Sequence, residues 1–137
     1  MWWIYALLSA LFASLTAIFA KIGIKNVNSD LATAIRTIII VIVAWGIVFA
    51  KGEQKGLPIL SKQNLLFLCI SGVATGLSWI FYFKALQIGK VSQVAPVDKL
   101  SVALTILLSF IFLKEIITLK MAIGAILIIA GTFVLIL

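Results

Sequence analysis

Residues 76–115 read GLSWIFYFKALQIGKVSQVAPVDKLSVALTILLSFIFLKE, two long apolar segments that meet at a short turn. Three ionisable side chains lie within them: Lys84 in the first segment, and Asp98 and Lys99 in the second. Ionisable groups are costly in the hydrocarbon of a bilayer, so their presence inside a membrane span points to function by default. The stretch therefore predicts two membrane helices that carry a polar site.

The composition of the chain is that of a membrane protein. Hydrophobic residues make up 64% of the 137 positions, whereas a soluble domain is roughly 45–50% apolar. A helix that crosses a bilayer needs about 20 mostly apolar residues. The apolar runs therefore predict an all-α membrane protein with one domain, residues 1–137, and about five transmembrane helices, at residues 2–20, 31–50, 65–88, 91–113 and 117–137. Asp30 or Ser29 is expected to cap the second helix, and Ser61 the third.

The residue types that the chain lacks exclude several kinds of site. It has no histidine, and Cys69 is its one cysteine, which leaves neither a zinc-ligand cluster nor an imidazole proton relay. No nucleophile stands beside a base, so we expect no enzyme, no metal and no cofactor. The net charge of +7 comes from basic residues that lie between the apolar runs. Basic residues that flank membrane spans commonly lie at the lipid headgroups. We expect a multi-pass protein of the cell (inner or plasma) membrane, in contact with the lipid bilayer and not with nucleic acid.

Small residues predict where helices pack. Gly72 and Gly76 form a GxxxG pattern in the third span, and Gly124 and Gly131 lie seven residues apart in the fifth, hence on one face. Such positions let another helix approach closely in a membrane.

Polar side chains form stripes on two predicted helices. The first stripe consists of Ser71, Thr75, Ser78 and Tyr82. These side chains either form hydrogen bonds between helices or line a cavity, and the sequence favours neither role. The second consists of Asp98, Ser101, Thr105 and Ser109. Pro96 lacks an amide hydrogen, so it should kink the fourth helix and free a backbone carbonyl. Freed carbonyls at membrane depth are tolerated where the backbone lines a cavity or is buried in protein.

The charges within the spans lie in one half of the membrane. At 1.5 Å per residue, Arg36 is about 7 Å, Lys84 about 6 Å and Asp98 about 10 Å from the surface that is opposite the N-terminus. The stems of Arg36 and Lys84 are long enough to reach the headgroups. Asp98 either forms an ion pair with Arg36, Lys84 or Lys99 that only positions helices, or belongs to a polar pocket that faces the bundle interior.

The basic residues of the loops give only a weak orientation bias. Five lie on the N-terminal side (Lys51, Lys55, Lys62, Lys114 and Lys120) and three on the other (Lys21, Lys25 and Lys90). Transporters are often built from inverted repeats, and a five-span chain that inserts in both directions supplies both repeats as an antiparallel homodimer. This is a hypothesis about the partner of the chain.

Four segments and one arginine together resemble the EamA domain of the drug/metabolite transporter superfamily. They are YFKALQIG at 82–89, VAP at 94–96, FLKE at 112–115, the glycine-spaced stretch 124–131, and Arg36 early in the second span. The resemblance covers nearly the whole chain in the family's order. It implies five helices that make up half of a ten-helix inverted-repeat transporter, working by alternating access as a dimer on small metabolites.

Departures from the family pattern bear on the substrate. Lys114 replaces the usual glycine, and Asp98-Lys99 stands where many members have small polar residues. The first span has no acid, unlike the small multidrug exporters of the superfamily, whose cation mechanism is therefore in doubt here. The excess of basic residues favours an anionic or zwitterionic, amino-acid-like solute. The substrate or coupling-ion candidates are Asp98, Lys99, Arg36, Lys84, Tyr82, Ser101 and Thr105. A non-transporting membrane subunit or scaffold is the alternative, and a small multidrug cation exporter is a further one.

Overall fold

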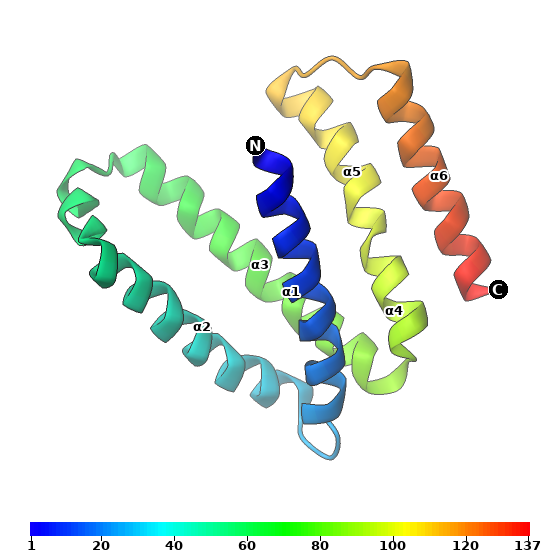
Figure 1. Cartoon of the computed structure of the whole chain (residues 1–137), viewed down its shortest axis with the longest axis horizontal. Helices are drawn as coiled ribbons and strands as arrows, with labels where there is room; N and C mark the ends of the chain where they lie inside the picture. Colours follow the sequence, from blue (N-terminus) through cyan, green and yellow to red (C-terminus); the bar gives the residue numbers. More distant parts are fainter. The chain divides into compact units, whose positions relative to one another are not determined.

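The computed structural model describes residues 1–137 and is built entirely from helices (Figure 1). Five helical segments are long and apolar enough to cross a bilayer, which confirms the prediction of an all-α membrane protein. They are α1 (Trp2–Gly23), α2 (Ser29–Lys51), α3 (Lys62–Ile88), the segment Val91–Leu113, and α6 (Leu119–Ile136). Large apolar side chains cover their outer surfaces and are exposed, as a lipid-facing surface requires.

The ends of the helices follow from local polar chemistry. The Oδ1 atom of Asn28 accepts hydrogen bonds from the amides of Asp30 (2.8 Å) and Leu31 (3.2 Å), so Asn28 is the N-cap of α2. The expectation of Asp30 or Ser29 in this role was wrong, because both already lie in the first turn of the helix. Ser61 does cap α3, since its Oγ accepts from the Asn64 amide at 3.1 Å.

Two residues with positive φ end helices where the chain must change direction. Gly52 has φ 72° and closes α2 before a 3₁₀ helix, η1 (Glu53–Ile59). Lys114 has φ 55° and closes a π-helical turn, η2 (Ser109–Leu113). The left-handed conformation favours glycine, because a Cβ atom crowds the following carbonyl oxygen there.

The fourth span is interrupted in its first half. It comprises α4 (Val91–Asp98), α5 (Leu100–Leu108) and η2, with the break at Lys99 (Figure 1). The Lys99 amide lies between the carbonyl oxygens of Ala95 (3.3 Å) and Pro96 (3.1 Å), a tightened turn. Pro96 provides the cause, since it lacks an amide hydrogen and disturbs the regular ladder.

The chain divides into two compact units. Residues Phe19–Gln87 form one unit, and Met1–Ile18 with Ile88–Leu137 form the other. In the second unit α6 packs along α4 and α5. The hydroxyl of Thr132, which is buried, shares its one hydrogen between the Ile128 carbonyl at 2.8 Å and the Pro96 carbonyl at 3.2 Å. The proline carbonyl thus has a partner on a neighbouring helix.

The unit formed by Phe19–Gln87 has its buried side chains at one end. They come from the end of α1, the start of α2 and the end of α3: Ala20, Ile24, Ser29, Thr33, Phe83 and Leu86. Two side chains also bond to backbone carbonyls there. The Nζ of Lys21 donates to the Leu86 carbonyl, and the Nε2 of Gln87 donates to the Val27 carbonyl at 2.7 Å. These contacts hold the α1–α2 turn against the last turns of α3.

Candidate functional site

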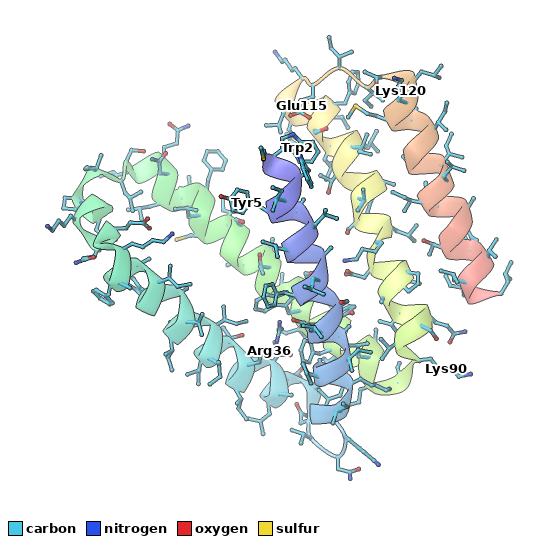
Figure 2. All side chains as sticks on the ribbon, viewed as in Figure 1. Trp2, Tyr5, Arg36, Lys90, Glu115 and Lys120 are labelled. Atoms are coloured by element: carbon cyan, nitrogen blue, oxygen red, sulfur yellow. The ribbon has the colours of Figure 1, made fainter.

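Arg36 lies on two aromatic rings. Its guanidinium carbon is 4.6 Å from the centre of the Trp79 ring and 5.1 Å from the centre of the Phe83 ring. Both distances are within the range of about 6 Å in which a cation is attracted to the face of an aromatic ring. Figure 2 shows the Arg36 side chain reaching from α2 toward the neighbouring helices of its unit. The arginine is half-buried and its position is set by α3.

Helical spacing explains how this arrangement arises. Ser29, Thr33 and Arg36 are separated by four and three residues, so they share one face of α2, and the first two are buried. Trp79 and Phe83 are four residues apart and share one face of α3. Residues three or four apart are neighbours on a helix surface. The long Arg36 side chain bridges these two faces and reaches the Trp79 and Phe83 rings.

Lys84 has a carboxylate partner at the same end of the unit. Its Nζ is 3.5 Å from Oδ1 of Asp30, and the side chains of both residues are 53% exposed. Lys84 therefore has an exposed carboxylate partner within its unit. The headgroup contact and the pocket both stay predictions for this lysine. Tyr82 packs with its ring edge-to-face against Phe83, at 6.3 Å between ring centres.

Asp98 and Lys99 form the second charged group. Nζ of Lys99 is 3.3 Å from Oδ2 of Asp98, with 58% of the lysine and 36% of the aspartate side chain exposed. Lys99, one of the three ion-pair partners considered for Asp98, is thus paired with it within the same unit. The pair lies at the break between α4 and α5.

The hydroxyls that follow this break bond within their own helix. The Thr105 hydroxyl donates to the Ser101 carbonyl at 2.8 Å, and both residues are exposed. Such a bond satisfies the hydroxyl locally. The polar face of α5 therefore requires no partner helix for its stability.

The candidate residues fall into two groups, one in each unit. Arg36, Lys84 and Tyr82 belong to residues Phe19–Gln87, and Asp98, Lys99, Ser101 and Thr105 belong to the other unit. The sequence reasoning missed three participants in the first group: Asp30, Trp79 and Phe83. Asp30 was assigned only as a cap, although it begins the second span at the same membrane surface as Lys84. The four-residue spacing of Trp79 and Phe83 was the signal for the aromatic pair.

The predicted packing glycines are uncovered within their own units. A Cβ atom built on Gly72, Gly76, Gly124 or Gly131 meets no atom of the same unit within 4 Å. These faces therefore remain available for a helix from elsewhere.

Comparison with known proteins identifies the family of the chain. The EamA-like transporter family matches residues 1–137. A Sinorhizobium protein named "Uncharacterized transporter in cobO 3′ region" is 45% identical over 134 residues, which cover 98% of this chain and 95% of that protein. An uncharacterized protein of Methanocaldococcus jannaschii is 34% identical over 132 residues, covering 96% and 93%. No solved structure matches. With this match and its five apolar helices, the chain belongs to the EamA-like transporter family and is a multi-pass membrane protein.

Proposed function

We propose that this protein is a secondary transporter of small metabolites, with amino-acid-like, anionic or zwitterionic solutes favoured. The observation that carries the proposal is the family match over the whole chain. The charged residues inside the spans support it, since membrane proteins keep such groups mainly where solutes or ions pass. Export or uptake of solutes, and not catalysis, is the activity that this family suggests.

The working unit that we propose is an antiparallel homodimer that moves by alternating access. Both relatives are chains of nearly this length, because the alignments cover 95% and 93% of them. A unit of five spans needs a second, inverted unit to enclose a central site. The uncovered glycine faces supply surfaces on which such a partner would pack.

Transport is tested with purified protein in liposomes. Vesicles loaded with unlabelled amino acids should take up a radiolabelled amino-acid mixture, and Asp98→Asn with Lys99→Gln should abolish the uptake while the dimer persists. Lys120→Gln, which removes one charge outside the site, serves as the control. Movement of hydrophobic cations alone would overturn the preference for anionic or zwitterionic solutes.

The uncovered glycines also favour a second candidate, a non-transporting membrane subunit. In that case no solute moves, and the Asp98→Asn variant loses assembly.

The orientation of the chain is tested by labelling a C-terminal tag in intact and broken cells. Labelling from both sides supports the antiparallel dimer, and labelling from one side excludes it.

A further inference from the structure

The structure distinguishes Arg36 from the other cations inside the spans. Lys84 is paired with Asp30 at 3.5 Å, and Lys99 with Asp98 at 3.3 Å. Within the unit Phe19–Gln87, no carboxylate forms an ion pair with the Arg36 guanidinium. Arg36 therefore differs from Lys84 and Lys99, because no carboxylate of its own unit forms an ion pair with it.

The way in which Arg36 is held leaves its hydrogen-bonding groups free. Trp79 and Phe83 contact the guanidinium through ring faces. A guanidinium has five N–H donors in its own plane, and no hydrogen bond joins them to another residue of the chain. Aromatic stacking and hydrogen bonding to an anion use different directions of the group, so one does not prevent the other.

We infer that Arg36, supported by Trp79 and Phe83, binds the carboxylate of the transported solute. This inference rests on the proposed transport function and names the group of the solute that the site recognises. The fork of N–H donors matches the two oxygens of a carboxylate, and charge-assisted bonds of this kind are roughly twice as strong as neutral ones. Lys84 and Lys99, by contrast, each have a carboxylate partner within the chain.

Binding is measured through the tryptophan that touches the arginine. Substituting Trp2, Trp3 and Trp45 by Phe leaves Trp79 as the single tryptophan. The protein in dodecyl maltoside is titrated with benzoate and L-leucine, and with benzamide and L-leucinamide as partners that lack the carboxylate. A saturable change in emission is expected with both carboxylates and not with the amides.

Three variants test the role of Arg36. Arg36→Gln should weaken carboxylate binding about 10- to 100-fold, since a hydrogen bond to a charged group contributes about 1.5–3 kcal/mol. Arg36→Lys should keep part of the affinity, because the charge stays and the fork is lost. Lys120→Gln, the control for net charge, should leave it unchanged. Equal affinity in Arg36→Gln and the parent protein would overturn the inference.

A lipid phosphate offers the same oxyanion chemistry, so the titration is repeated in nanodiscs with phosphatidylglycerol. Saturable benzoate binding that still requires Arg36 supports the solute. A change in Trp79 emission caused by phosphatidylglycerol alone, without a benzoate response in detergent, would overturn the inference that Arg36 binds the solute.

Flux in liposomes is measured separately. Carboxylate binding without flux contradicts the transport function and leaves the binding site standing, whereas flux unaffected by Arg36→Gln contradicts the binding site alone.

Discussion

At the scale of single residues, Lys114 has a left-handed backbone that costs stability. Lys114 stands where the resemblance to the EamA pattern leads us to expect glycine, and it adopts φ 55° at the end of η2. An L-residue in the left-handed region costs roughly 1–2 kcal/mol. Glycine avoids this cost and loses about 0.5–1 kcal/mol of conformational entropy instead.

Lys114→Gly should therefore raise the free energy of unfolding by up to about 1 kcal/mol. Lys114→Val should lower it, because a β-branched residue is disfavoured at positive φ. Unfolding in mixed detergent, followed by circular dichroism, measures both changes. Ala130→Gly, in the interior of helix α6, is the control and should lower the stability. If Lys114→Gly lowers the free energy of unfolding as much as the control does, the positive φ at Lys114 is contradicted.

Asn28 provides a second test at this scale. Asn28→Ala removes the side chain that caps α2 and should cost about 0.5–2 kcal/mol of stability. Asn28→Asp keeps an acceptor and should cost little. The unfolding midpoint in detergent distinguishes them. The comparison variant is Asp30→Ala, which removes only the exposed pair with Lys84; a larger loss there than in Asn28→Ala would restore Asp30 as the cap.

At the scale of elements, the interrupted fourth span depends on its neighbour. Pro96 weakens the helix, and the hydroxyl of Thr132 on α6 donates to the proline carbonyl. The break is therefore held by a tertiary hydrogen bond as well as by its own chain.

Thr132→Val should lower the free energy of unfolding by about 0.6–1.7 kcal/mol, the size of hydrogen bonds between membrane helices. Thr75→Val is the matched control, since the Thr75 hydroxyl donates only to the Ser71 carbonyl of its own helix. The two variants are compared by their unfolding midpoints in detergent. Equal effects would mean that the contact between α6 and α4 adds no stability.

At the scale of the whole molecule, the uncovered glycine faces predict assembly. Gly76→Ile meets no atom within its unit, so the monomer should fold, whereas a partner helix at this face would be displaced. We expect the dimer fraction in liposomes, measured by energy transfer between labelled protomers, to fall with an affinity loss of at least about tenfold.

Gly46→Ile is the control for this change. Gly46 is equally open and lies outside the GxxxG pattern, so its substitution should leave the dimer intact. An unchanged dimer fraction in Gly76→Ile, and likewise in Gly72→Ile, would remove this face from the proposed interface.

The sequence by itself determined the fold class and the family. Apolar runs of span length admit only helices, because a bilayer offers no hydrogen bonds to the backbone, and the kink at Pro96 follows from the missing amide hydrogen. The sequence also identified candidate polar residues, since charges inside apolar runs are rare; their role in a site stays a prediction. These properties depend on near neighbours in the chain and on the surrounding lipid.

Only the tertiary structure decided which charges are neutralised. Asp30 and Lys84 are far apart in the sequence, and Arg36 is far from Trp79 and Phe83. Spacing along a single helix therefore does not reveal either contact. The contrast between Arg36, which lies on aromatic rings, and Lys84, which is paired with Asp30, depends on side chains of α2 and α3 that meet in space. Electrostatic pairing acts over a few ångströms in space, which no pattern within a single span records.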